Sequence, residues 1–572
     1  MASFDCQEAT EREVPGMLEG VVPYPPEFAA RYRQKGYWED RPLISFFDEA
    51  FAEFADRIAL VSGAERVTYR ELAQRVERLA LHFLELGIKP LDRVVVQLPN
   101  VPEFVYVYFG LQKIGAIPVM ALPPHRYREI RYFVELTEAV GYVIPDRLGD
   151  FGFAELAGRI RDECPSLHFV LAHGDEVPPG SVSLRELLQK ESALDRSALH
   201  RIKIDPTDPA VFQLSGGTTG VPKLIPRTHN DYVFNSKCAA SMVGVTRADA
   251  VLITLPIAHN LPLACPGIQG YFLRGARVVL STSPRAADVF PLIERERITH
   301  LKVVPALLIR WINDPVIARY DLSSVRVIQS GGQRLQPEVK RLTETVIPSA
   351  TVQENFGMAE GLLIFVRLND PYEVRLETVG RPMCDDDEVR LVDDEGREVP
   401  DGEVGELACR GPYTLCGYYR APEHNARAFT ADGFYLTGDL MRRHPSGNLI
   451  VEGRKKDLIN RGGEKISAEE IENLILSHPS VHNVACVPVP DPVLGERTCA
   501  FIIPRSGQSV TVEDLARFLT EAGIAKFKLP ERVETVSSFP VTRVGKLDKL
   551  ELRRIVAKKL EDERSGAVEK GT

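Results

Sequence analysis

A short segment that begins at Ser215 combines the residue types that bind phosphate groups. Its sequence, SGGTTGVPK, places three glycines and two threonines directly before Lys223. Glycines allow positive φ and let consecutive N–H groups point into one concavity, while threonine hydroxyls and a lysine ammonium add donors. Such a segment suits a polyphosphate, although its order differs from the Walker A loop, which ends in Gly-Lys-Ser/Thr. The predicted phosphate ligands are Ser215, Gly216, Gly217, Thr218, Thr219, Gly220 and Lys223.

The elements on either side of this segment predict an α/β fold. Short β-branched runs, which we interpret as buried strands that end in loops, alternate with helical patterns over residues 67–87 and 286–298. This alternation favours largely parallel sheets, in which ligands bind at the carboxyl ends of the strands. Glycine-rich or polar loops follow the runs at 215–220, 259–260 and 330–333. The runs are RVVVQLPN, AVFQLSGG, AVLITLPIAHN, ARVVLST and VRVIQSGG.

The pattern of predicted secondary structure changes near residue 385. Short strands and Gly-rich turns then predict a small antiparallel, β-barrel-like part, followed by a boundary within residues 453–466, a helix over 468–477 and further strands. We therefore expect a large N-terminal domain over 1–455, built of mainly parallel sheets with helices plus the β-barrel-like part. A small C-terminal α+β domain over 456–572 completes the expected α/β architecture.

Composition and charge argue against several classes of function. The 572 residues exceed what one hydrophobic core organises, and 44% hydrophobic with 26% charged residues is typical of a globular protein. The net charge of −10, from 70 basic and 80 acidic residues, argues against binding to nucleic acid or an anionic membrane. No apolar run reaches the roughly 18 residues of a membrane span, and the N-terminus lacks the apolar core of a signal peptide. Nine cysteines without a CxxC pair predict reduced thiols in the cytoplasm.

Five ordered motifs resemble those of the adenylate-forming superfamily, which includes acyl-CoA synthetases, peptide-synthetase adenylation domains and firefly luciferase. They are LSGGTTGVPK, NFGMAEG, YLTGD, GRKKDLINRGGEKI and PVTRVGKLDK, and they extend over more than 300 residues. Two further segments, PPEFAARYRQKGYWEDRPL and RGPYTLCGYY, narrow the resemblance to aryl-acid–AMP ligases of the siderophore type, which act on salicylate or 2,3-dihydroxybenzoate.

The resemblance implies two half-reactions that use ATP and Mg²⁺. The carboxylate of an aryl acid attacks the α-phosphorus of ATP to give aryl-AMP and pyrophosphate. A thiol then attacks the acyl carbonyl and expels AMP. The first step brings an anion toward a polyanion, so it requires cations and N–H donors where negative charge develops.

Several residues take catalytic or nucleotide-binding roles by this resemblance. Lys546 matches the lysine that bridges the carboxylate and the α-phosphate, and Glu360 matches the residue that helps hold Mg²⁺, a cation that prefers oxygen ligands. His259 is placed with them as the third predicted catalytic residue. Asp439 matches the carboxylate that accepts both ribose hydroxyls, and Arg454 assists it.

The remaining assignments concern adenine, the acid and the hinge. Gly331, Gly332 and Gln333 match the loop that lies against adenine, and Phe356 matches an aromatic residue that packs there. Lys456 matches the hinge about which the C-terminal domain is expected to swing between the half-reactions. The family often has threonine where Ala359 stands, so one phosphate contact is lost. Further predicted nucleotide ligands are Asn355 and Gly357, and the predicted acid-binding residues are His259, Asn260, Leu261, Cys265, Gly332, Gly357, Leu363 and Lys546.

Three positions narrow the choice of acid. Asn260 is a neutral amide where relatives that activate amino acids carry a carboxylate, so an α-ammonium group would be buried without a counter-charge. The Asn260 amide can instead bind an ortho hydroxyl. Cys265 resembles a serine, and Leu363 a valine, of the dihydroxybenzoate-activating relatives. The Cys265 thiol is a weaker hydrogen-bond donor than a serine hydroxyl, and Leu363 is one methylene larger than valine. Both differences predict a preference for salicylate over 2,3-dihydroxybenzoate.

The sequence therefore predicts an enzyme that forms salicyl-AMP and transfers the acyl group to the phosphopantetheine thiol of an aryl carrier protein. The pathway implied is nonribosomal synthesis of a siderophore. A 2,3-dihydroxybenzoate–AMP ligase and a stand-alone aryl-CoA ligase are the nearest alternatives. A non-catalytic nucleotide-binding module is an alternative of another class, which would be expected to have lost Lys546, Glu360 or Asp439, and all three are present.

Overall fold

The computed structural model describes residues 18–215, 222–461, 464–491, 494–522, 524, 526–542 and 547–569. The predicted phosphate ligands Gly216 to Gly220 and the predicted catalytic Lys546 lie outside these residues. Among the described residues, no helix combines the length and the apolar character needed to cross a bilayer.

A seven-stranded sheet ends in the hairpin that contains the predicted phosphate-binding segment. Its order is β11-β10-β4-β3-β5-β8-β9, and its pairs are parallel except for β10 and β11, which form an antiparallel hairpin. The segment from residue 215 to 223 therefore joins two neighbouring antiparallel strands. The strands are β3 (Arg93–Val96), β4 (Ile117–Met120), β5 (Gly141–Pro145), β8 (Phe169–His173), β9 (Val182–Ser183), β10 (Pro209–Leu214) and β11 (Leu224–Thr228).

A second, nine-stranded sheet has the order β18-β17-β16-β15-β14-β12-β13-β1-β2. The strands from β16 to β1 along this order are parallel, and the outer pairs are antiparallel. Their carboxyl ends consequently meet at one edge. The strands are β1 (Ile58–Ser62), β2 (Glu65–Thr68), β12 (Ala250–Ile253), β13 (Arg277–Leu280), β14 (His300–Val303), β15 (Val327–Gly331), β16 (Thr351–Gly357), β17 (Leu363–Phe365) and β18 (Arg381–Pro382).

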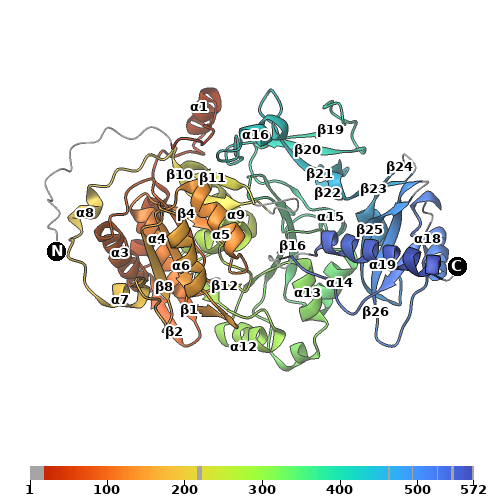
Figure 1. Cartoon of the computed structure of the whole chain (residues 1–572), viewed down its shortest axis with the longest axis horizontal. Helices are drawn as coiled ribbons and strands as arrows, with labels where there is room; N and C mark the ends of the chain where they lie inside the picture. Colours follow the sequence, from red (N-terminus) through yellow and green to blue (C-terminus); the bar gives the residue numbers. More distant parts are fainter. Residues whose placement is uncertain are drawn as a thin grey trace.

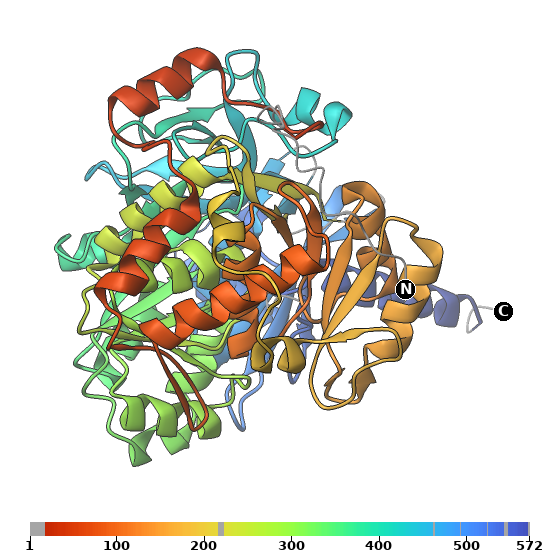
Figure 2. The ribbon, with the colours of Figure 1, turned by 90° about the vertical axis from the view of Figure 1, so that its left-hand side faces the viewer.

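Helices pack between the two sheets and on their outer faces (Figures 1 and 2). The largest hydrophobic cluster joins side chains of both sheets through α2 (Leu43–Glu53), α3 (Tyr69–Glu85), α4 (Pro102–Lys113), α9 (His229–Val243) and α11 (Gly267–Leu273). A second cluster packs α12 (Ala286–Glu296), α13 (Pro305–Ile312) and α14 (Pro337–Val346) against the nine-stranded sheet. A third packs α5 (Tyr127–Thr137) and α6 (Ala154–Glu163) against the other sheet. Short elements complete the body: β6 (Arg147–Leu148), β7 (Phe151–Gly152), α7 (Leu184–Gln189), α8 (Ser197–His200), α10 (Asn260–Ala264), η1 (Pro315–Arg319) and α15 (Tyr372–Glu377).

The predicted strands and the three predicted helices are confirmed, and so is the α/β architecture. The helix expected over 67–87 begins at Tyr69, because Thr68 accepts a hydrogen bond from the backbone of Glu71 and the Glu71 side chain returns one to the Thr68 backbone. This reciprocal capping satisfies donors that the first turn would otherwise leave unpaired.

The region after residue 385 forms a four-stranded antiparallel sheet of order β19-β20-β21-β22. Its apolar side chains share a cluster with Ile225, Leu362 and Ile364 of the two large sheets, which joins it to the body. Helix α1 lies against it, where Arg31 Nη1 donates to Glu388 Oε1 of β19 at 3.4 Å. The elements are α1 (Pro26–Gln34), β19 (Glu388–Val392), β20 (Val404–Arg410), α16 (Pro422–Ala428), β21 (Tyr435–Arg443) and β22 (Leu449–Arg454).

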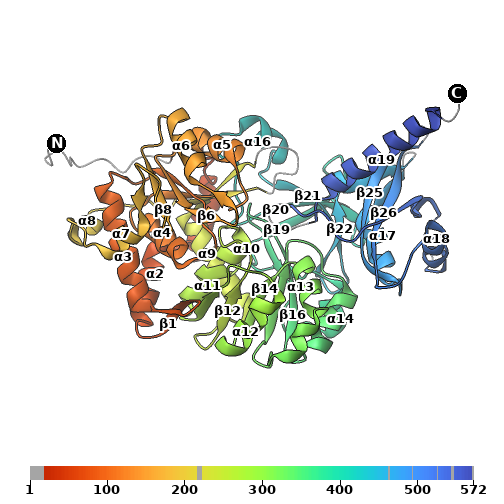
Figure 3. The same cartoon turned by 60° about the horizontal axis from the view of Figure 1, so that its bottom comes forward.

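A smaller C-terminal domain lies beside β22 (Figures 1 and 3). Its sheet has the order β24-β23-β26-β25 with β27 next to β26, and its two described hydrophobic clusters lie within residues 459–560. A separate core of this kind fits a body that can move as a unit. Its elements are η2 (Lys455–Asp457), β23 (Leu458–Arg461), β24 (Glu464–Ser467), α17 (Ala468–Leu476), β25 (Val481–Asp491), β26 (Gly495–Pro504), α18 (Val512–Glu521), η3 (Lys526–Lys528), β27 (Arg532–Thr535) and α19 (Lys549–Glu569).

Candidate active site

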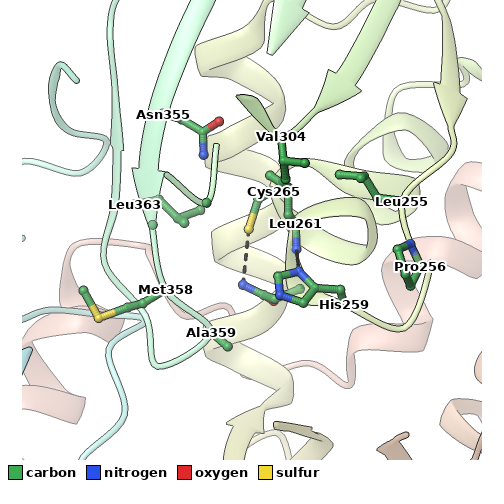
Figure 4. A pocket seen from close by; sticks show the side chains of 13 residues that line it. Leu255, Pro256, His259, Leu261, Cys265, Val304, Asn355, Met358, Ala359 and Leu363 are labelled. Atoms are coloured by element: carbon green, nitrogen blue, oxygen red, sulfur yellow. Dashed lines mark hydrogen bonds between the residues drawn. The ribbon is translucent and has the colours of Figure 1, made fainter. Parts of the chain in front are cut away.

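A cavity opens where α10 faces the carboxyl ends of strands of the nine-stranded sheet (Figure 4). Val304 follows β14, Gly332 follows β15, and Asn355 lies near the end of β16. These strands are parallel neighbours, so their ends converge on one side of the sheet. The lining is Leu255, Pro256, His259, Asn260, Leu261, Cys265, Val304, Gly332, Asn355, Gly357, Met358, Ala359 and Leu363. Every predicted acid-binding residue except Lys546 lies in this lining.

A chain of hydrogen bonds orients the amide of Asn260, which is buried on α10. Gln213 Nε2 donates to the Tyr232 hydroxyl at 3.2 Å, and that hydroxyl donates to Asn260 Oδ1 at 2.8 Å. Asn260 Nδ2 then donates to Cys265 Sγ at 3.3 Å. Because the Oδ1 atom is already engaged, the amide presents its N–H donors toward Cys265 and the cavity.

His259 sets the start of α10. It is the residue that caps the helix, and its Nδ1 accepts from the backbone N–H of Leu261 at 3.3 Å. The imidazole itself lines the cavity, as Figure 4 shows. His259 therefore both fixes the turn that carries Asn260 and contributes to the wall.

The backbone carbonyl of Cys265 accepts hydrogen bonds from two side chains of the nine-stranded sheet. It accepts from Lys302 Nζ at 2.6 Å and from Gln329 Nε2 at 2.9 Å. Burial raises the pKa of the Cys265 thiol to about 11, so the thiol is protonated and only a weak donor at neutral pH. Burial also lowers the pKa of Lys302 to about 7, since the ammonium meets neutral partners there.

The wall opposite α10 is formed by β16 and β17, where close packing requires glycine. A Cβ atom at Gly357 would lie 2.4 Å from Leu363 Cδ2. At Gly331, the Cβ atom would lie 2.8 Å from Asn355 Oδ1. Both glycines therefore leave room for side chains of this wall, and neither position tolerates a Cβ without a shift.

Glu360 and Asp439 lie close together next to the cavity. Glu360 Oε1 accepts from the Tyr418 hydroxyl at 2.8 Å, and Tyr418 in turn contacts the Tyr435 hydroxyl at 2.8 Å. Burial raises the pKa of Glu360, and the nearby Asp439 charge adds to this shift while Arg454 opposes it. Burial therefore disfavours the anionic form of Glu360, and a bound cation would stabilise it.

Asp439 is buried and paired with Arg454 across β21 and β22. Arg454 Nε donates to Asp439 Oδ1 at 2.7 Å, and Nη2 donates to Oδ2 at 3.4 Å. The Asp439 charge is the main cause of the raised pKa of Arg454. The structure thus brings together the two residues that were assigned to the ribose.

The two ends of the predicted phosphate-binding segment, Ser215 and Lys223, are hydrogen-bonded to each other. The backbone N–H of Ser215 donates to the carbonyl of Lys223 at 2.9 Å, and the Lys223 N–H donates to Ser215 Oγ at 2.9 Å. Lys223 Nζ lies 5.8 Å from the ring centroid of Tyr418, which is hydrogen-bonded to Glu360. The Lys223 ammonium is therefore near the tyrosine that contacts the carboxylate assigned to Mg²⁺.

The adenine assignments fall on neighbouring strand ends. Gly332 follows β15 with φ 87°, which favours glycine, and Gln333 continues that loop. On β16, Phe356 packs against the cluster that joins the four-stranded sheet to the body. Of the remaining predictions, Lys456 lies in η2 between β22 and β23, and its side chain is outside the described part of the structure.

Sequence reasoning missed three residues that shape this site. Tyr232 and Tyr418 each complete a hydrogen-bond chain, and Lys302 holds the Cys265 carbonyl. Tyr418 lies within the quoted segment RGPYTLCGYY, but no role was assigned to it. For Lys302 a signal existed, because HLKVV places a lysine inside an apolar strand.

Comparisons with known proteins agree with this geometry. The AMP-binding enzyme family matches residues 47–419, and the AMP-binding enzyme C-terminal domain matches residues 470–546. A salicylyl-CoA synthase / salicylate adenylyltransferase of Streptomyces sp is 48% identical, covering 94% of this chain and 98% of that protein. A 2,3-dihydroxybenzoate-AMP ligase of Bacillus subtilis is 46% identical, and the match covers 95% of this chain and 99% of that protein.

A solved structure shows the same relationship. The apo structure of Mycobacterium smegmatis MbtA has 41% sequence identity and a TM-score of 0.72, and covers 94% of this chain and 98% of that chain. The family match spans more than half of the chain, and the relatives are matched over nearly their whole length. The chain therefore belongs to the AMP-binding enzyme family, in which it groups with the aryl-acid–AMP ligases.

Proposed function

We propose that this enzyme activates salicylate with ATP and transfers the acyl group to the phosphopantetheine thiol of an aryl carrier protein. The observation that carries the choice of acid is the oriented amide of Asn260, whose N–H donors face the cavity next to Cys265. An ortho oxygen on the ring accepts from this amide. The cavity wall that α10 supplies carries no carboxylate for an α-ammonium group among its described residues, which argues against an amino acid.

The first half-reaction places opposite charges where they are needed. Lys223 and the segment before it bind the phosphates, Asp439 with Arg454 binds the ribose, and Lys546 bridges the carboxylate and the α-phosphate. Glu360 would hold Mg²⁺, which neutralises phosphate charge when bound, and the buried carboxylate whose pKa is raised suits a divalent cation. We further propose that Lys456 is the hinge between a domain of residues 1–455 and a mobile domain of residues 456–572.

The preference for salicylate over 2,3-dihydroxybenzoate rests on Cys265 and Leu363. Both are buried, and both line the cavity. A second hydroxyl at ring position 3 would meet a protonated thiol, which is a weak hydrogen-bonding partner. Leu363 also takes space beside the ring. The 2,3-dihydroxybenzoate–AMP ligase is the alternative if this second hydroxyl is accommodated.

The acceptor is the second open choice. The name of the Streptomyces relative includes the synthesis of salicylyl-CoA as well as adenylation, so an aryl-CoA ligase is the alternative here. The resemblance to siderophore-type ligases supports a carrier protein, with the reaction taking place in the cytoplasm as part of nonribosomal siderophore synthesis.

The test combines pyrophosphate exchange with acceptor assays. ATP–pyrophosphate exchange is measured across benzoate, salicylate, 2,3-dihydroxybenzoate and an amino acid, and the acids that pass are offered holo-carrier protein or CoA. We expect exchange with salicylate and acyl transfer to the carrier. If none of the tested acids supports exchange, the enzyme proposal is refuted. If the acyl group is transferred to CoA but not to the carrier protein, CoA is the acceptor.

A further inference from the structure

Asn355 places a side-chain amide at the wall of the acid-binding cavity. Its side chain is 3% exposed, it lines the cavity, and its Oδ1 has no hydrogen-bond partner among the described residues. Figure 4 shows the amide nitrogen of this side chain directed toward the space between Leu363 and Cys265, and the oxygen turned away from that space. Because buried polar groups in folded proteins are almost always paired, such an amide indicates a partner that arrives with the ligand.

The geometry around Asn355 keeps this amide in place. Its strand, β16, pairs in parallel with β15, where Asn355 lies opposite Gly331. The Gly331 position has no room for a Cβ beside the amide, as its built Cβ would lie 2.8 Å from Oδ1. Glycine therefore lets the Asn355 amide lie flat against the neighbouring strand, within reach of the cavity.

The two amides of the cavity come from opposite walls. Asn260 belongs to α10. Asn355 belongs to β16 (Figure 4). If Asn260 binds the ortho hydroxyl, then ring position 3 is next to it and faces Cys265, which contacts Asn260 at 3.3 Å. The ring edge that reaches Asn355 is the one farther from this corner, at positions 4 and 5.

We propose that the preferred substrate is a 2-hydroxybenzoate that carries a second hydrogen-bonding group, a hydroxyl or an amino group, at ring position 4 or 5. Asn355 binds that group and is thus a specificity-determining residue. An amide can donate and accept, so it serves either substituent. This inference rests on the proposed activation of a salicylate-type acid and specifies the substrate class further. It differs from the assignment of Asn355 to the nucleotide, in which the ring substituent would have no effect.

The experiment uses substituents of similar size that differ in hydrogen bonding. Pyrophosphate exchange gives kcat/KM for 4-hydroxy- and 4-methylsalicylate, for the corresponding 5-substituted pair, and for salicylate. For the wild type we expect the hydroxyl compound to exceed its methyl partner by at least about tenfold at one of the two positions, and to equal or exceed salicylate. A hydroxyl-to-methyl ratio of one or below at both positions would overturn the inference.

Variants then assign the preference to the amide. Asn355→Leu keeps the side-chain size, and we expect the hydroxyl-to-methyl ratio to fall to about one or to invert. Met358→Leu, which changes another lining residue without adding or removing an amide, is the matched control and should keep the wild-type ratio. An unchanged ratio in Asn355→Leu would remove the residue from substrate selection. If that variant does not fold, the wild-type ratios still decide.

The outcome also separates this inference from the function on which it depends. If no benzoate supports exchange, the proposed function itself is wrong. If salicylate supports exchange but neither hydroxyl compound exceeds its methyl partner, the function stands and the assignment to Asn355 fails. If Asn355→Leu raises the KM for ATP equally with all acids, Asn355 belongs to the nucleotide site.

Discussion

The proposed acid-binding cavity and the neighbouring proposed nucleotide site differ in the charge of the side chains that form them. In the cavity, Asn260, Asn355 and Cys265 offer neutral amides and a protonated thiol. On the nucleotide side, Glu360 is a buried carboxylate and Asp439 forms an ion pair with Arg454. Neutral donors can discriminate between ring substituents at modest energetic cost, whereas the buried charges are proposed to act on phosphate and ribose, which are the same for every acid.

This difference separates two kinds of mutational effect. A change on the nucleotide side should reduce adenylation of all acids by a similar factor. A change in the cavity should alter the ratio between acids much more than the use of ATP. The following predictions test this separation and are given from the largest expected effect to the smallest.

Lys546→Ala should reduce adenylation by about 10²–10³ with every acid, because it removes a charge directed at the transition state. Pyrophosphate exchange measures this loss, while ATP binding and thermal stability should change little. Transfer from preformed aryl-AMP to the acceptor should survive, since the proposed domain movement withdraws the lysine before that step. Lys558→Ala, which changes an exposed lysine on α19, is the control. Near-normal exchange in Lys546→Ala would remove this residue from the mechanism.

Lys456→Pro should separate the half-reactions. Proline fixes φ near −65°, so the backbone can no longer rotate as a hinge requires. If the locked state is the adenylating one, exchange should persist while acyl transfer to the carrier falls by at least about tenfold. Lys456→Ala removes the same side chain but leaves the backbone free, and it should retain both steps. Equal loss of both steps in the proline variant would refute the hinge assignment.

The wild type should favour salicylate over 2,3-dihydroxybenzoate by at least about tenfold in kcat/KM. An unpaired second hydroxyl costs roughly 1–3 kcal/mol, and 1.4 kcal/mol corresponds to a factor of ten. Cys265→Ser combined with Leu363→Val should recover activity on the dihydroxy acid. Leu363→Val alone shows how much of the recovery is due to space. A wild-type preference for the catechol would contradict the salicylate assignment but not the ligase assignment.

Tyr232→Phe should reduce kcat/KM for salicylate by about tenfold and that for benzoate by less. The change removes the hydroxyl that donates to Asn260 Oδ1, so the amide that binds the ortho oxygen loses its orientation. Tyr271→Phe is a matched control, because the Tyr271 hydroxyl is buried without a hydrogen-bond partner in the described structure. Equal losses with both acids would show that Tyr232 acts on stability and not on the ortho contact.

The smallest effect expected concerns pH. Burial raises the pKa of Cys265 to about 11, so its thiol is protonated below that value and thiolate forms only as the pH approaches it. Lys302, whose pKa is lowered to about 7, titrates between pH of about 6.5 and about 8.5 in both the wild type and Cys265→Ser. Over this range the salicylate-to-dihydroxybenzoate ratio of kcat/KM should therefore change by the same factor, to within about twofold, in the two proteins. The Cys265→Ser variant, which has no thiol, provides the reference profile. A ratio that shifts in the wild type alone as the pH rises would mean that the thiol ionises at a lower pH.

Much of the fold followed from local sequence pattern. Each run of β-branched residues that was interpreted as a buried strand forms one, and the helix over 67–87 appears as α3. These features depend on the period of the apolar residues and on nearby caps, which neighbouring residues alone determine. The motifs also placed Asp439 and Arg454 in one site, where they form an ion pair. The roles of Lys546 and Lys456 stay predictions.

The sequence by itself determined which side chains could bind phosphate, ribose and acid, because those chemical capacities belong to the residue types. Only the tertiary structure decided how these side chains are oriented and to which site each of them belongs. Tyr232 directs Asn260 from 28 positions away, and Tyr418 reaches Glu360 from 58 positions away. Asn355 and Phe356 are neighbours in one motif, yet one lines the acid cavity and the other packs toward the four-stranded sheet. Successive residues of a strand point to opposite faces, so the pairing of β16 with its neighbours assigns adjacent residues to different sites.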